Sequence, residues 1–254
     1  MDPELQSALA ALLLAAGDDE LILGHRNSEW CGQAPILEED IAFANLALDE
    51  IAHAQAWYEL HAGLVGEDPQ TYPDRLVYFR AADDFRCLRL VELPRGDWAF
   101  SMLRQYFFDL YENIYLRELS ASTYPPLAET AARLRKEEVY HLRHARAWIV
   151  RLGLGTDESH SRLQAALDAL WPYTQQLFLP GPGESALSAA GIAPERSRVQ
   201  QDWMEQAHAL VQECELQMPA AGEPPASRRE HISGFKVLID ELQSVARLDP
   251  EAAW

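Results

Sequence analysis

The chain has 254 residues, of which 48% are hydrophobic and 24% are charged, the composition of an ordinary soluble globular protein. Its 40 acidic residues against 21 Lys and Arg residues leave a net charge of −19. Nucleic acids and anionic membrane surfaces both require a basic face on the protein that binds them. We therefore expect neither nucleic acid nor membrane as a partner.

The cysteines and the apolar runs indicate the compartment. Cys31, Cys87 and Cys214 are far apart and form no Cys-x-x-Cys pair, so they predict neither a disulfide framework nor a zinc site. The apolar run 9–16 follows acidic residues and not a basic segment, which argues against a signal peptide. No apolar run approaches the roughly 18 residues of a membrane span. We expect a cytoplasmic protein.

Apolar residues recur every three or four positions, which predicts an all-α protein. The first long helix is expected to end near residues 31–32. The second follows Pro35, carries three acidic residues in its first turn and ends near residues 63–66. A long connection, 67–98, comes next, and within it residues 85–93 fit either a short helix or an extended segment.

Two further long helices are predicted at 99–119, which is apolar on most sides, and from Pro125 to about residue 152. Shorter helices are expected at 163–178, 199–218 and 235–247, with a linker at 219–229. Four long helices with one long crossover match the ferritin-like variant of the four-helix bundle. We expect a single domain, 1–254, with a bundle core at about 4–152 and additional C-terminal helices at about 160–250.

Two Glu-x-x-His pairs are candidate metal ligands: Glu50 with His53, and Glu138 with His141. Residues three apart on a helix project from the same face. Two such pairs, with one carboxylate from each of the other two helices, form the inward-facing di-iron carboxylate constellation. Each metal then has hard oxygen ligands and one imidazole, with positions left open for oxygen.

The motif alone is weak evidence, because about one such pair is expected by chance in a chain of this composition. A third pair, Glu205 with His208, falls on a polar helix face and is expected to be solvated. The other two pairs fall on apolar stripes, where ionisable groups are costly to bury unless something pairs them. A metal is one such partner.

The two remaining ligands are sought by the same argument. Glu20 lies in the apolar stripe of the first helix, and we prefer it to Glu29, which lies on another face. Asp109 in the third helix has more apolar neighbours than Glu112. The predicted metal set is Glu20, Glu50, His53, Asp109, Glu138 and His141.

Other interpretations of these residues involve protein partners alone. Buried carboxylates can pair with Arg26, Arg104 or Arg135, and buried histidines can be satisfied by hydrogen bonds. Glu137 is expected to be solvated, with His144 as its partner. A cluster of arginines in the crossover predicts a solvated surface or a contact between subunits before a coenzyme A site; its members are Arg75, Arg80, Arg86 and Arg89.

At the level of motifs the chain resembles the PaaC-type subunits of bacterial phenylacetyl-CoA epoxidases. The resemblance is carried first by the run from Leu21 to Pro35, with its Glu-Trp-Cys-Gly-x-Ala-Pro segment. It continues through the runs 37–40, 104–107, 140–143, 151–153 and 155–157, and reaches the terminal Trp254. It therefore covers nearly the whole chain.

The resemblance implies a ferritin-like subunit of a multicomponent mono-oxygenase of aerobic phenylacetate breakdown. Such a complex adds one oxygen atom from O2 to the aromatic ring of phenylacetyl-CoA, which gives a ring 1,2-epoxide. The homologous A-type subunit holds the di-iron centre and the substrate, and a reductase with flavin, an iron–sulfur cluster and NADPH supplies electrons. The C-type subunit pairs with the A-type subunit as a structural partner, is not catalytic alone, and has commonly lost the ligands. Self-association is a further option.

This chain departs from that pattern because both Glu-x-x-His pairs are complete. We rank a structural subunit first and an oxygen-activating di-iron protein second. In the second case Glu50 and Glu138 bridge the metals, His53 and His141 are terminal ligands, and apolar side chains shield the site, namely Trp57, Tyr106, Phe107 and Phe108. An iron-storage protein ranks third, because the length and the extra helices fit it less well.

Overall fold

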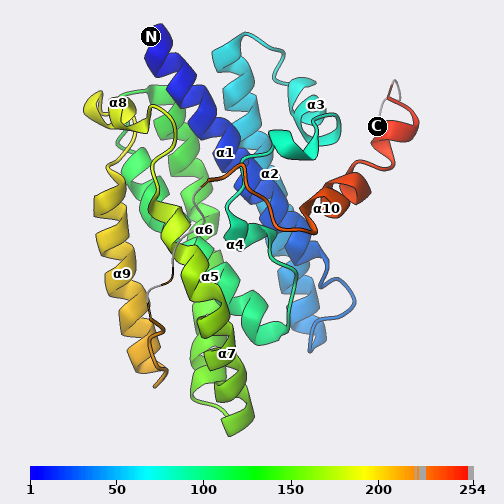
Figure 1. The fold of residues 1–254 in the computed structure, drawn as a ribbon, viewed down its shortest axis with the longest axis vertical. Helices are drawn as coiled ribbons and strands as arrows, with labels where there is room; N and C mark the ends of the chain where they lie inside the picture. The colour runs from blue at the N-terminus through cyan, green and yellow to red at the C-terminus, as the bar shows by residue number, and fades with distance from the viewer. Residues whose placement is uncertain (221, 223–226, 251–254) are drawn as a thin grey trace.

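The computed structural model describes residues 1–220, 222 and 227–250 of the chain. Four long helices dominate: α1 (Pro3–Ser28), α2 (Leu37–Val65), α5 (Trp98–Leu119) and α6 (Pro125–Gly153). α1 packs mainly on α2, α5 mainly on α6, and α2 also contacts α6 (Figure 1). The described residues form no strand, and the protein is an all-α ferritin-like bundle with additional C-terminal helices.

Local signals explain where the long helices begin and end. The side chain of Asp2 accepts a hydrogen bond from the backbone N–H of Glu4 at the start of α1, and Asp97 does the same for Phe100 at the start of α5. α2 ends at Gly66, whose φ of 81° is left-handed. The first helix ends at Ser28, a turn earlier than predicted, because residues 29–33 form turns instead.

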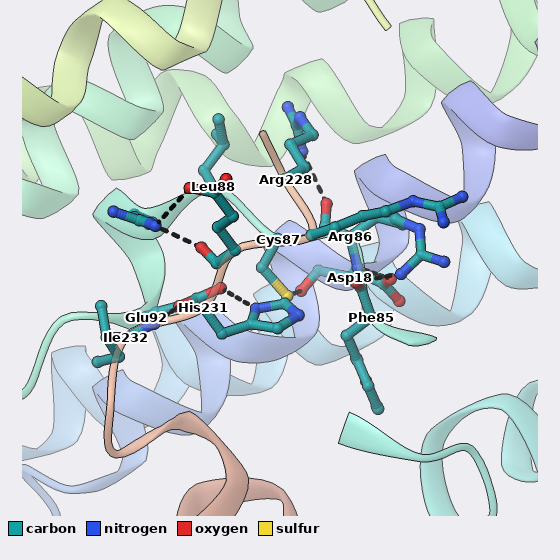
Figure 2. Close-up of polar contacts among 12 residues, drawn as sticks. Asp18, Phe85, Arg86, Cys87, Leu88, Glu92, Arg228, His231 and Ile232 are labelled. Atoms are coloured by element: carbon teal, nitrogen blue, oxygen red, sulfur yellow. Dashed lines mark hydrogen bonds and ion pairs between the residues drawn. The ribbon is translucent and has the colours of Figure 1, made fainter. Parts of the chain in front are cut away.

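The crossover between α2 and α5 holds more structure than the sequence predicted. It contains α3 (Tyr72–Tyr78), the 3-10 turn η1 (Ala82–Asp84) and the single turn α4 (Arg89–Glu92). Residues 85–88 are not helical, and the backbone is extended at Phe85 and Leu88, so an extended piece and a short helix follow one another within 85–93. The backbone N–H of Arg86 donates to Asp18 of α1, and that of Leu88 donates to Asp19 (Figure 2). These hydrogen bonds hold the segment against the bundle.

The remaining helices pack beside the bundle. They are α7 (Asp157–Thr174), η2 (Gln175–Phe178), α8 (Glu184–Ala189), α9 (Arg196–Glu213), α10 (Phe235–Leu242) and η3 (Ala246–Leu248). α7 starts six residues earlier than predicted, at a capping box between Thr156 and Ser159. α9 and α10 are shorter than predicted. Part of the predicted linker (221 and 223–226) and Trp254 lie outside the described residues.

The returning C-terminal segment is tied to the crossover. His231 Nδ1 lies 2.6 Å from one carboxylate oxygen of Glu92, and the backbone N–H of Ile232 donates to the other at 2.9 Å (Figure 2). Glu92 is fully buried, so both of its carboxylate oxygens need hydrogen-bond partners within the protein. This contact joins segments about 140 positions apart in the sequence and positions α10 beside the bundle.

No helix within the described part of the chain is long and apolar enough to cross a membrane.

Candidate metal centre

The four long helices direct ionisable side chains into the interior of the bundle. Glu20 comes from α1, Glu50 and His53 from α2, Asp109 from α5, and Glu138 and His141 from α6. All six are buried, with at most 3% of their surface exposed. Such a concentration of buried carboxylates is costly unless positive charge is present.

The helices can approach closely at this level because α1 carries a glycine there. A Cβ atom at Gly24 would lie only 3.0 Å from both the carbonyl oxygen of Ala47 and the Cβ atom of Glu50. A larger residue would push α1 away from the part of α2 that carries Glu50. The absence of a side chain at residue 24 therefore helps to bring Glu20 and Glu50 together.

Two groups of three residues could each hold a metal ion. Glu20, Glu50 and His53 form one group, and Glu50, Glu138 and His141 form the other. Within each group the ligand atoms lie within 4.8 Å of one another. Because Glu50 belongs to both groups, the two candidate positions are adjacent. Five of the six predicted residues are therefore brought together in these groups.

Asp109 is connected to the cluster by hydrogen bonds from the side-chain amide of Gln105. The Nε2 atom of Gln105 donates to Asp109 at 2.6 Å and to Glu50 at 2.7 Å. The Oε1 atom of Gln105 in turn accepts from the Nδ2 atom of Asn27 at 2.7 Å. This chain of amides holds one oxygen of each carboxylate and leaves the second oxygen of Asp109 without a partner among the described residues. Sequence reasoning missed Gln105, although it lies one helical turn before Asp109.

Both histidines turn the same ring nitrogen toward the carboxylates. His53 Nδ1 lies 3.3 Å from Glu138 and 3.8 Å from Glu20, and His141 Nδ1 lies 3.1 Å from Glu138 and 3.8 Å from Glu50. The rings stack with centroids 5.9 Å apart. Each Nδ1 is therefore available to a metal at the centre of the bundle.

The other ring nitrogens are held by carboxylates at the surface. His53 Nε2 lies 2.7 Å from Glu137, and His141 Nε2 lies 3.2 Å from Asp49. About half of each of these two carboxylate side chains is exposed, at 53% for Glu137 and 45% for Asp49. Metal-bound histidines characteristically donate their second nitrogen to a carboxylate in this way. The expectation for Glu137 was wrong in part: His53 is its partner, and His144 pairs with Glu39 at 2.7 Å.

Several carboxylate oxygens in the cluster have no hydrogen-bond partner among the described residues. They are both oxygens of Glu20 and one oxygen each of Glu50, Asp109 and Glu138. Such buried polar atoms are rare in folded proteins and require an explanation. Oxygen-rich sites with one imidazole per metal suit iron and similar divalent ions. The donor set therefore fits a pair of metal ions.

The charge states follow from this environment. Burial and the neighbouring Glu50 raise the pKa of Glu20 well above its usual value, and burial and Glu138 do the same for Asp109. Burial alone would raise the pKa of Glu138 too, but His141 and His53 outweigh it and lower that pKa to about 2. Burial opposes the charged imidazoles, yet Glu138 raises the pKa of His53 to about 9 and that of His141 to about 12. Without metal, the histidinium ions supply the positive charge.

The arginines that could have neutralised these carboxylates are engaged elsewhere. Arg26 bonds Glu29 and the carbonyl of Glu92, and Arg104 bonds the carbonyl of Leu93. Among the described residues, Arg135 donates a hydrogen bond only to the carbonyl of Asn113. This removes the interpretation of the cluster as a set of carboxylate–arginine pairs.

Three of the other sequence candidates lie outside the cluster: Glu29 pairs with Arg26, and Glu205 and His208 are exposed as predicted. Glu112 is buried near the cluster, where burial and the neighbouring Glu138 raise its pKa, but like Asp109 it belongs to neither group of three. The predicted wall residue Phe107 packs against Trp171 and Trp203 of the C-terminal helices.

The crossover arginines do not form the predicted solvated cluster. Arg80 is largely buried and pairs with Asp18, Arg89 pairs with Glu230, and Arg75 pairs with Glu67. The pairs of Arg80 and Arg89 join the crossover to α1 and to the C-terminal segment, whereas Arg75 stays exposed in a pair within the crossover.

Comparison with known proteins agrees with the resemblance noted in the sequence. The whole chain, residues 1–254, matches the family described as phenylacetic acid catabolic protein. The chain is also 36% identical over 248 residues to the C subunit of 1,2-phenylacetyl-CoA epoxidase from Escherichia coli (strain K12). That match covers 97% of this chain and 99% of the relative.

Proposed function

Because this chain belongs to the phenylacetic acid catabolic protein family, we propose that it is the C-type subunit of a phenylacetyl-CoA epoxidase complex. The observation that carries this proposal is the match to the C subunit of that epoxidase over nearly the full length of both chains. Its partners in the complex are a homologous A-type subunit, which carries the substrate, and a reductase.

We further propose that this chain holds a di-iron centre of its own. The support is the set of buried carboxylate oxygens without partners, arranged around two inward-facing imidazole nitrogens. A bound pair of iron ions would supply electrons and open coordination positions for oxygen. Glu50 would contact both ions, because it belongs to both groups of three.

The chain's own residues would do three things around such a centre. Asp49 and Glu137 orient the two histidines, and Gln105 holds Glu50 and Asp109 in place. Burial of all six ligands keeps bulk water out, which strengthens each electrostatic contact.

A structural role in the complex is favoured by a different observation. Exposed apolar side chains occur on the outer faces of α2 and α6, two helices that contact each other: Leu48, Ile51, Val139 and Tyr140. Apolar surface of this kind is typical of interaction sites. We propose this face as the contact with the A-type subunit. A structural role and a metal centre do not exclude each other.

Two measurements test the two proposals separately. The tagged chain is co-expressed with an A-type subunit, and co-purification and phenylacetyl-CoA epoxidation by the complex are measured with and without this chain. Failure to associate, or equal activity without the chain, would contradict the subunit proposal.

Metal content is then measured on the chain purified alone from iron-supplied cells. We expect about two irons per chain, and loss of iron in a variant that carries Glu50→Leu and His53→Gln. A folded wild-type chain that binds no iron would contradict the di-iron proposal and leave the structural role. Because both buried ionisable side chains are replaced together by neutral ones, we expect its fold to persist, as judged by circular dichroism.

A further inference from the structure

A cavity of about 430 Å³ lies outside the candidate metal centre. It is enclosed by the N-terminal part of α1, the C-terminal part of α5 and the connection between α7 and α8. Ser227, Arg228 and Arg229 form a further wall. They belong to the segment that leads to α10 (Figure 1). None of the six candidate ligands lines it. Its volume falls in the range of small-molecule sites, about 300–1,000 Å³.

One side of this cavity is apolar. α1 presents a row of small and aliphatic side chains, and the connection before α8 presents a leucine and two prolines. These residues are Ala8, Ala11, Leu12, Leu179, Pro180 and Pro182. Such a wall suits the hydrocarbon part of a ligand and offers it no hydrogen bond.

The other side gathers positive charge, which is scarce in a chain with a net charge of −19. Four arginines line the cavity, against three acidic residues. Arg228 and Arg196 are paired with Asp19 and Glu184, respectively. Arg228 also donates to the carbonyl oxygen of Arg86 at 3.1 Å, so these two residues lie side by side (Figure 2).

Neither of the remaining two arginines forms an ion pair with a described residue, although the charges of Asp18 and Asp84 act on Arg86. The side chain of Arg229 is exposed and makes no hydrogen bond with the described residues. Among the described residues, the side chain of Arg86 donates only to backbone carbonyls, those of Asp83 and Phe85. Partial burial and then Arg229 lower the pKa of Arg86, which shows that the two guanidinium groups repel each other. A bound anion would relieve this repulsion.

Two buried groups in the lining are ready to donate hydrogen bonds. The hydroxyl of Tyr115 and the Nε2 atom of Gln176 have no hydrogen-bond partner among the described residues. The other side-chain atom of Gln176, Oε1, is held by the backbone N–H of Arg89 at 2.8 Å, so the amide is fixed in orientation. Unpaired buried donors of this kind are costly, and a ligand with acceptor oxygens would satisfy them.

We propose that this cavity binds a small carboxylate with an apolar body, at a site separate from the candidate metal centre. The hydrocarbon part lies against α1 and the prolines, and the carboxylate lies toward Arg86 and Arg229. A few convergent polar groups at one end of a mostly apolar pocket are the usual arrangement of a small-molecule site. Guanidinium groups are well suited to carboxylates because they donate paired hydrogen bonds.

The site is tested on the purified full-length chain by isothermal titration calorimetry with octanoate. Octanamide, which has the same body without the charge, and inorganic phosphate, which has charge without the body, serve as comparison probes. We expect octanoate to bind and both comparison probes to bind at least about tenfold more weakly, the loss that corresponds to one charge-assisted hydrogen bond.

Three variants locate the binding. Arg229→Ser removes an exposed guanidinium and should weaken octanoate about tenfold without affecting the fold. Ala15→Phe, at a lining position on α1, should fill the cavity and abolish binding. Arg75→Ser is the matched control, because Arg75 is exposed, pairs with Glu67 and does not line the cavity.

Three results would overturn the proposal. They are no octanoate binding at millimolar concentration, equal binding of octanamide or phosphate, and octanoate binding that Arg229→Ser leaves unchanged. If Ala15→Phe does not fold, as judged by circular dichroism, the Arg229→Ser result decides. The assay requires neither metal nor a second protein, so its outcome is independent of the epoxidase proposal.

Discussion

Glu137 Oε2 lies 2.7 Å from His53 Nε2, and this contact joins the exposed edge of α6 to the interior of α2. It determines which nitrogen of His53 faces the carboxylates, because a ring held at Nε2 must present Nδ1 inward. Asp49 does the same for His141 from the opposite helix. The arrangement is reciprocal. Asp49 of α2 contacts the histidine of α6, and Glu137 of α6 contacts the histidine of α2.

Removal of these outer carboxylates should weaken metal binding without unfolding the chain. We expect Glu137→Ala and Asp49→Ala each to reduce iron affinity about 10- to 100-fold, because each variant loses the carboxylate that orients one histidine. Iron titration and far-UV circular dichroism check this. Glu129→Ala, on the exposed face of α6, is the control and should change neither. Unchanged affinity in both test variants would contradict the orienting role of the two carboxylates.

Metal affinity should rise with pH. His53 and His141 have raised pKa values of about 9 and 12, and burial raises the pKa of Glu20, so these groups hold protons near neutral pH. Ligands must lose protons to bind a metal, so binding releases protons. Calorimetric titrations of iron in buffers of different ionisation enthalpy should detect this release. No difference between buffers would contradict the assignment.

The metal-free chain should lose stability between pH 6.5 and 9. The pKa of His53 is raised by its carboxylate neighbours from 6.5 to about 9, so the protonated ring favours the folded state. That contribution is complete below pH 6.5 and is lost as the pH rises through about 9, with a loss of up to about 3 kcal/mol. Urea denaturation across this range measures it. A metal-loaded sample should show a much flatter profile, since its histidines carry no proton at Nδ1.

Gln105→Leu should destabilise the bundle by about 2–4 kcal/mol. The change removes the donor to Glu50 and Asp109 and leaves the amide of Asn27 unpaired, and each buried group left without a partner costs about 1–3 kcal/mol. Chemical denaturation of the metal-free chain checks the value. Gln55→Leu is the control, because Gln55 is exposed and its side chain, within the described part of the chain, bonds only Glu59 on its own helix. A loss no larger than that of the control would contradict the bridging role.

Two glycines in long helices should respond to alanine in opposite directions. Gly24→Ala should destabilise by about 1–3 kcal/mol, because its Cβ atom would press on the backbone of α2 beside Glu50. Gly63→Ala should stabilise by about 0.5–1 kcal/mol, because nothing lies within 4 Å of its Cβ position and alanine is the better helix former. Thermal denaturation of both variants is the measurement, and stabilisation by Gly24→Ala would contradict the close approach of α1 and α2.

The sequence by itself was enough to predict the four long helices and the bundle. Apolar spacing, first-turn acids and helix-ending glycines act within a few residues, so they can be read along the chain. It also placed Glu50, His53, Glu138 and His141 on buried stripes, where the structure has them. The ferritin-like arrangement followed from helix lengths and one long crossover.

Only the tertiary structure decided the partners of those side chains. Contacts such as His53 with Glu137, Gln105 with Glu50, and His231 with Glu92 join residues from about 55 to 140 positions apart, and no local pattern records them. The cavity beside α1 likewise arises from segments that meet only after folding. Helix periodicity fixes which face is buried, whereas the depth, rotation and neighbours of each side chain depend on how the helices pack.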